Sequence, residues 1–336
     1  MRNNQLITLL CSLNNIPEDF FNNWWCGIIH FTKEFIKITL IFERQPPSII
    51  KKGKNFGAKI RWLIGSKLDC NMIRGLTGTA TIVNEAWLTN EGENRSSEAS
   101  VTSIFNGVAR FEYHRNSEVS ATLYSSKLMS ISRKMTKRLE KITDEKYALK
   151  FSTKITWNNE ELDIAVISLP ICLTTHQVQD ELSTGKIMWD YAFAAKDRQA
   201  FQVPDTVQWS QLADALSGLW NSRIGCTLTK DHIKYLYDRV FVEDPSCTEI
   251  PMRLISWNNI TKDNMPGMNF TFWNWFYKAM KLVKDTYKEA WMSGHILGFI
   301  HREKAKGLLE GSRPFTFLFR FSESIEGKFR NLQEVG

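Results

Sequence analysis

The sequence has 336 residues and a formal net charge of +7 at pH 7. A chain of this length exceeds a typical single core, so it predicts two or three domains. Its 43% hydrophobic and 24% charged residues exclude a wholly disordered chain. The basic balance favours a polyanionic partner such as nucleic acid.

The six cysteines are widely spaced and form no CxxC pair. This pattern favours free thiols in a reducing compartment over a disulfide framework or a zinc site. No segment approaches the ~18–20 apolar residues of a membrane-spanning helix. The apolar run at 6–13 is interrupted by polar residues and lacks a clear cleavage site. We therefore expect a protein of the cytoplasm or nucleus with no cofactor, no metal and no membrane partner.

The first predicted element is an amphipathic helix over residues 18–41. Apolar residues recur there at i, i+4 spacing, and the acidic start at Glu18 and Asp19 follows Pro17. The helix is expected to end before Pro46 and Pro47.

From about residue 39 to 204, short β-rich runs alternate with clusters of Gly, Asn and Ser. Regular spacing of this kind predicts an all-β sandwich or barrel. The predicted strands cover residues 58–64, 77–83, 101–113, 119–124, 148–156 and 163–175.

After Pro204 the pattern becomes helical and continues to about residue 310. Apolar spacing near 3.6 residues predicts helices over 209–220, 230–241 and 272–291. Arg313 and Pro314 end this pattern, and residues 315–321 have the composition of a strand. A helix followed by a strand suggests the start of an α+β domain.

The strongest chemical signal lies at residues 316–324, TFLFRFSES. Arg320 stands mid-strand among large apolar residues, where an unpaired charge is costly to desolvate. A guanidinium at such a position suits a phosphate dianion, which it can grip through two parallel hydrogen bonds. The hydroxyls of Ser322 and Ser324 could add donors, and Arg302 on the preceding helix could add charge. The alternatives are an arginine paired with a carboxylate and an edge-strand arginine that reaches water.

This string resembles the phosphate-gripping strand of the Src-homology 2 (SH2) domain of STAT proteins. Residues 291–300 are similar to the W-x-x-G-x-I-x-G-F-I of that family. Further matches occur upstream in the family's order: N-F-x-F-W-x-W at 269–275, L-I-x-W at 254–257, S-L-P at 168–170 followed by Trp189, and E-R-Q-P at 43–46. The matches run collinearly from about residue 30 to 327, so the sequence is identified as a member of the STAT family.

The resemblance implies a mixed, multidomain fold. Its parts are the end of a helical coiled-coil domain (1–38), an all-β immunoglobulin-like DNA-binding barrel (39–204), an α-helical linker domain (205–291) and a partial α+β SH2 domain (292–336). The match fades after Gly327. We therefore expect a chain truncated at both ends relative to the family, without reciprocal dimerisation through phosphotyrosine.

The resemblance also implies two binding sites. Arg320 would be the principal phosphotyrosine ligand, with Arg302 as the second cation. The phosphate loop would consist of Ser322, Glu323 and Ser324.

For DNA, Lys51 occupies the position of a loop lysine that enters the major groove, with Lys52 beside it. His176 stands where many members have a base-facing Asn. Because an imidazole has one donor and one acceptor, we expect an altered site preference. These lysines could also be a solvated turn, and His176 a plain surface histidine.

A basic run from Lys127 to Lys141 includes Lys137 and Arg138. It could contact DNA phosphates or serve nuclear import, although such runs are commonly solvated faces.

These features predict a sequence-specific DNA-binding transcription factor in tyrosine-kinase signalling. Its expected partners are double-stranded DNA, phosphotyrosine peptides and an upstream tyrosine kinase. The alternative is a truncated interaction protein that binds partners or DNA without activating transcription. An enzyme is not expected, since the sequence has neither a GxSxG elbow nor a GxxxxGK[ST] loop.

Overall fold

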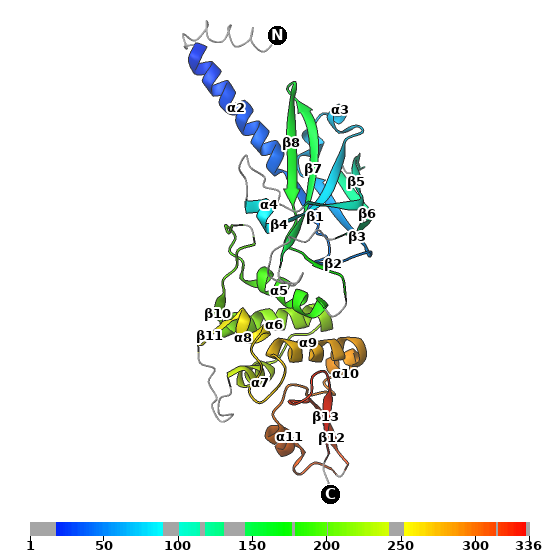
Figure 1. Ribbon diagram of the computed structural model, residues 1–336, viewed down its shortest axis with the longest axis vertical. Helices are drawn as coiled ribbons and strands as arrows, with labels where there is room; N and C mark the ends of the chain where they lie inside the picture. Colours follow the sequence, from blue (N-terminus) through cyan, green and yellow to red (C-terminus); the bar gives the residue numbers. More distant parts are fainter. Residues whose placement is uncertain are drawn as a thin grey trace. The chain divides into compact units, whose positions relative to one another are not determined.

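The computed structural model describes residues 18–89, 101–114, 118–130, 145–176, 179–199, 201–241, 252–313 and 315–333. The chain forms two compact units, Met1–His176 and Gln177–Gly336 (Figure 1). The first is built mainly from strands and the second mainly from helices.

A long helix and a seven-stranded antiparallel sheet make up the first unit. Helix α2 (Glu18–Ile38) leads directly into the sheet, whose strand order is β1-β3-β6-β5-β4-β7-β8. The sheet curls so that its edge strands β1 and β8 lie close to each other. Its strands are β1 (Leu40–Arg44), β3 (Asn55–Trp62), β4 (Thr77–Asn84), β5 (Val101–Tyr113), β6 (Val119–Leu128), β7 (Tyr147–Trp157) and β8 (Glu160–Ile167).

The interior of this sheet follows from alternation along the strands. In β3 every second residue from Phe56 to Trp62 is buried, so one face of the strand enters the core. Trp62, Phe111 and Phe151 pack in sequence, with ring centroids 5.6 and 5.9 Å apart. The Trp62 indole N–H donates to the Ile36 carbonyl at 3.2 Å, which fixes the end of α2 against the sheet.

A second, two-stranded sheet lies in the same unit. Strand β2 (Ile49–Lys51) pairs in parallel with β9 (Cys172–Thr174), so Lys51 lies beside Thr174. Short helices connect the remaining strands: η1 (Gly65–Lys67), α3 (Cys70–Ile73) and α4 (Glu85–Thr89).

The predicted helix at the start of this unit and its predicted strands are present, with two differences. The helix predicted to residue 41 ends at Ile38, and residues 40–44 form β1 instead. The single strand predicted over 163–175 is two strands, β8 and β9, separated by residues 168–171. Pro170 has no N–H to donate, so a continuous ladder through it is disfavoured.

The second unit is a cluster of helices with two small, two-stranded antiparallel sheets. Its helices are α5 (Asp180–Phe193), α6 (Trp209–Ile224), α7 (Lys230–Phe241), α8 (Trp257–Thr261), α9 (Phe272–Leu282), α10 (Lys288–Met292) and α11 (Arg302–Leu309). A π-helical turn (Val283–Tyr287) joins α9 to α10, so the helix predicted over 272–291 is present but not uniform. The strands are β10 (Thr206–Gln208) with β11 (Leu254–Ser256), and β12 (Phe317–Phe321) with β13 (Phe329–Gln333).

Aromatic residues fill the core of this unit. Trp220, Phe276 and Phe299 are completely or almost completely buried, and the rings of Trp220 and Phe299 lie 5.2 Å apart. Phe321, the last residue of β12, joins the same cluster, with its ring 4.6 Å from that of Phe299. The strand that carries Arg320 is therefore anchored to the same core as the helices.

Helix α5 was not predicted from the sequence, and it packs with the second unit. Its Trp189 belongs to the aromatic core, and the indole N–H of Trp273 donates to the Glu181 carbonyl at 2.9 Å. The helix buries small and polar residues such as Ser183 and Gly185 as well as apolar ones, so no clear apolar stripe marks it in the sequence.

Gly185 permits the close approach of α5 to two tryptophans. A Cβ at this position would lie 2.6 Å from Trp273 and 2.8 Å from Trp257. We predict that Gly185→Ala lowers the free energy of unfolding of the second unit by about 1–3 kcal/mol, because these buried rings would have to shift. Chemical denaturation followed by tryptophan fluorescence measures this change.

Gly218→Ala is the matched control, because a Cβ there meets nothing within 4 Å and the residue lies in α6. This variant should be neutral or more stable by up to about 1 kcal/mol. Equal stability of the two variants would contradict the packing of α5 described above.

Candidate functional site

One end of the first unit brings together three segments that are far apart in the sequence. The Lys52 N–H donates to the Thr174 carbonyl at 2.9 Å, and the Gly53 N–H donates to the Leu128 carbonyl at 2.9 Å. The Lys54 N–H closes the turn onto the Lys51 carbonyl at 3.1 Å. Gly53 has a φ of +75°, which a residue without a Cβ adopts at little cost.

Basic side chains gather at this end of the unit. Lys52, Lys54 and His176 are exposed and Lys51 is half-buried. Lys127, also half-buried, lies opposite Asn55 in the pairing of β3 with β6. Of the five predicted DNA-contacting positions, Lys51 pairs with Thr174 in the parallel β2–β9 ladder, and His176 follows Thr174 by two residues. Two of the five, Lys137 and Arg138, lie outside the described residues.

The predicted phosphate-binding residues cluster in the second unit, around the end of β12. Arg320 is buried, with 6% of its surface exposed, and its strand is bridged on one side to Gly298 and on the other to β13. Ser322 is buried, while Glu323 is half-buried and Ser324 is exposed in the loop that follows. Arg302 is the exposed first residue of α11.

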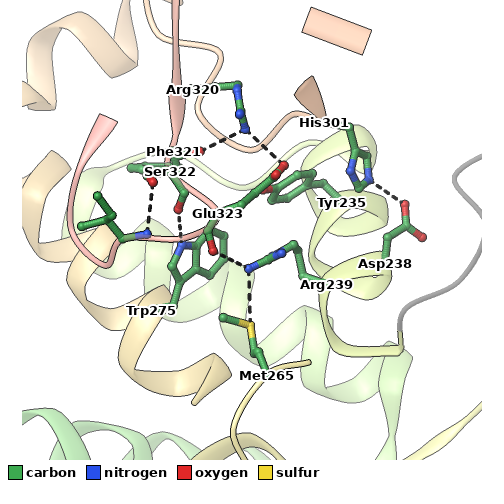
Figure 2. A network of polar contacts seen from close by, with 11 residues as sticks. Tyr235, Asp238, Arg239, Met265, Trp275, His301, Arg320, Phe321, Ser322 and Glu323 are labelled. Atoms are coloured by element: carbon green, nitrogen blue, oxygen red, sulfur yellow. Dashed lines mark hydrogen bonds and ion pairs between the residues drawn. The ribbon is translucent and has the colours of Figure 1, made fainter. Parts of the chain in front are cut away.

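Arg320 is paired with a carboxylate of this loop (Figure 2). Its Nη1 lies 3.1 Å from Glu323 Oε1 and 3.4 Å from the Phe321 carbonyl. Its Nε is buried and has no hydrogen-bond partner among the described residues. The carboxylate pairing that was one alternative from the sequence is therefore present, and the guanidinium retains an unused donor.

Residues of α7 and α9 hold this loop from the side of the helices (Figure 2). The Trp275 indole N–H donates to the Ser322 carbonyl at 2.8 Å, and Arg239 Nη2 donates to the Glu323 carbonyl at 2.9 Å. The Tyr235 hydroxyl donates to Glu323 Oε1 at 3.4 Å. Burial, followed by the charge of Glu323, raises the pKa of Tyr235 far above its usual range, so this hydroxyl stays protonated.

A second polar cluster continues from Tyr235 toward α11. The His301 ring packs on the Tyr235 ring at 4.6 Å, and its Nε2 lies 3.0 Å from Asp238 Oδ2. Asp238 is buried and also accepts from Lys234 at 2.5 Å. His301 directly precedes Arg302, so this cluster fixes the start of the helix on which the second predicted cation lies.

The contacts from α7 were not predicted from the sequence. Tyr235 and Arg239 lie 88 and 84 positions before Glu323, and no local pattern links them to the phosphate loop. Tyr235 and Arg239 are four residues apart on α7, so they lie on one face of that helix. This spacing was the only sequence signal that they could act together.

Other classes of site were sought among the described residues. No group of three or more His, Cys, Asp and Glu side chains in these ranges could hold a metal ion. The helices within them include none that is both long and apolar enough to cross a membrane. Among the described residues, Cys26, Cys70, Cys172 and Cys226 form no disulfide.

Comparison with known proteins gives two family matches in the order of the two units. Residues 44–174 match "STAT protein, DNA binding domain", and residues 196–276 match "Signal transducer and activator of transcription, linker domain". These matches cover the curled sheet from the end of β1 onward, with its lysine turn, and most of the helical core.

Two curated relatives carry the name "Signal transducer and transcription activator". The protein from Anopheles gambiae is 31% identical over 320 residues, which is 93% of this chain and 44% of the relative. The protein from Drosophila melanogaster is 34% identical over 307 residues, which is 88% of this chain and 39% of the relative. The chain thus spans less than half the length of these relatives. The two domain matches and the two relatives together show that it belongs to the STAT family.

Proposed function

We propose that this chain is from a sequence-specific DNA-binding transcription factor that acts in tyrosine-kinase signalling. The observation that carries the proposal is the parallel pairing of β2 with β9, which places Lys51 beside Thr174, two residues before His176. A phosphotyrosine site at Arg320 is the second part of the proposal. The partners of the protein would be double-stranded DNA, phosphotyrosine peptides and an upstream tyrosine kinase.

The basic end of the first unit supports DNA binding. Lysine ammonium groups attract phosphates without regard to sequence and release counterions, so they supply affinity and orientation. His176 differs in kind, because an imidazole can donate to or accept from a base edge. A lysine turn paired with the strand that precedes an exposed histidine suits a surface that docks on the DNA backbone and contacts few bases.

The buried arginine supports phosphate binding. Arg320 lies at the end of a strand, next to a loop that offers the hydroxyls of Ser322 and Ser324. Its unused Nε is a donor that a second anion oxygen can satisfy. Arg302, at the start of α11, supplies a further cation from a separate element.

The family also guides the proposed layout. We propose a coiled-coil remnant over 1–38, an immunoglobulin-like barrel beginning at residue 39, a linker domain ending at 291 and a partial SH2 domain over 292–336. The predicted boundary at 204/205 stays a prediction, although the packing of α5 favours counting 177–204 with the linker helices. A protein with this layout would act in the cytoplasm and the nucleus, and would not be an enzyme.

The first prediction from the proposed function concerns Lys51. Lys51→Ala should weaken binding to all duplex sequences by a similar factor and should lower the slope of log affinity against log salt by about 1, because one phosphate contact is lost. Fluorescence anisotropy titrations at several salt concentrations measure both quantities.

Lys154→Ala is the matched control for charge. Lys154 is exposed near the β7–β8 turn and pairs with Glu161 and Asp163. If both alanine variants weaken DNA binding equally, net charge rather than the lysine turn carries the interaction.

The second prediction concerns His176. His176→Asn should change which DNA sites are selected from a random pool more than it changes total affinity, because a carboxamide presents a paired donor and acceptor. Selection followed by sequencing gives the site preference. Identical preferences for the two proteins would remove His176 from the base-contacting set.

The third prediction concerns Arg320. Arg320→Lys keeps the charge but loses the planar fork, so binding to a phosphotyrosine peptide should fall at least about tenfold. Calorimetric titration with the phosphorylated peptide and its unphosphorylated form measures this loss.

Arg223→Lys, at the end of α6, is the surface control and should bind like the unmodified protein. Retained affinity in Arg320→Lys would locate the phosphate elsewhere.

A further inference from the structure

The guanidinium of Arg320 is already engaged by an anion of its own chain. Glu323 lies three residues further on and its Oε1 is 3.1 Å from Arg320 Nη1. The arginine side chain is 8% exposed, whereas the glutamate side chain is 30% exposed. The carboxylate thus neutralises a buried cation while remaining accessible to solvent itself.

This carboxylate is held by a group that belongs to the helices. The Tyr235 hydroxyl donates to the same oxygen, Oε1, that faces Arg320 (Figure 2). Tyr235 is 2% exposed, so its hydroxyl has no access to bulk water as a substitute partner. Arg239 fixes the backbone of the same residue through the Glu323 carbonyl and stacks over the Trp275 ring at 5.5 Å.

A phosphate dianion on Arg320 would meet this carboxylate at contact distance. One guanidinium carries one positive charge, and two anions beside it repel each other strongly where water is largely excluded. The side chain of Glu323 must then turn away into solvent, for which its partial exposure leaves room. Its departure also removes the acceptor of the buried Tyr235 hydroxyl, which is costly.

We propose that Glu323 is a resident competitor for phosphate at Arg320 and that Tyr235 of α7 sets the strength of this competition. The inference rests on the proposed phosphotyrosine site and adds a property to it. A phosphate dianion can displace the Glu323 carboxylate from Arg320, because it brings more negative charge to the guanidinium. A ligand with a single negative charge, like that of Glu323, gains little from the exchange. The pocket is thereby biased toward phosphate over carboxylate ligands.

The opposite role for Glu323 makes the proposal testable. If Glu323 served only to orient Arg320 for its ligand, then removing its charge would weaken phosphate binding. If Glu323 competes, then removing its charge strengthens binding. The sign of the change separates the two roles.

The experiment uses the full chain and a phosphotyrosine peptide as the probe, titrated by calorimetry. Glu323→Gln should bind about threefold to tenfold more tightly, because a partly exposed ion pair no longer opposes the ligand. Tyr235→Phe should bind more tightly by a smaller factor. The double variant should bind no more tightly than Glu323→Gln, because Tyr235 acts through Glu323.

Glu326→Gln is the matched control. It removes the same charge from the same loop, but Glu326 pairs with Lys278 rather than with Arg320. Its affinity should equal that of the unmodified protein. The thermal midpoint of each variant identifies any loss of folding.

Two failures are distinguishable. If the unmodified protein binds the peptide in an Arg320-dependent way and Glu323→Gln binds equally or more weakly, the competition is overturned and the site stands. If neither protein shows binding that Arg320→Lys reduces, both the site and the competition are overturned. Independent, additive gains from Glu323→Gln and Tyr235→Phe would overturn the role assigned to Tyr235.

Discussion

A guanidinium cannot be buried at the end of a strand without an anion, and this constraint organises the second unit. Arg320 meets it with Glu323, and the loop that carries Glu323 is in turn fixed by Trp275 and Arg239. The pairing offsets the cost of burying Arg320 in a setting that would be prohibitive for an isolated cation. The same arrangement leaves the Arg320 Nε without a hydrogen-bond partner among the described residues.

The aromatic core explains why this loop has a defined position. Phe321 directly follows Arg320 and inserts into the cluster around Phe299, so the strand cannot shift without opening the core of the helices. Trp275 belongs to that core and also donates to the loop backbone. Packing and the polar network therefore fix the same few atoms. This combination suits a site whose geometry must be preserved before a ligand arrives.

Much of this arrangement could be predicted from local sequence. β-rich runs that alternate with turn clusters along the chain predicted β3 and β7, and helical spacing predicted α6, α7 and α9. An arginine among apolar residues made β12 a candidate site, which stays a prediction. Helix α5 escaped because its buried face includes small polar residues, and β2 and β9 were missed as a pair because each has three residues. The role of Tyr235 could not be predicted, because the contact joins residues 88 positions apart and depends on how α7 meets β12. Short-range patterns identify elements and charges, whereas the partner of a buried charge is decided by tertiary packing.

The pairing of β2 with β9 has a consequence for how the protein is made. Lys51 leaves the ribosome early, yet the backbone that holds its turn, at Thr174 and Leu128, is synthesised much later. Contacts of such sequence separation form slowly, and they cannot form at all until the later segment has emerged. The basic end of this unit is therefore completed only near the end of the unit's synthesis. A nascent chain would expose these lysines before it could orient them, so an incomplete polypeptide would lack the proposed DNA-binding surface.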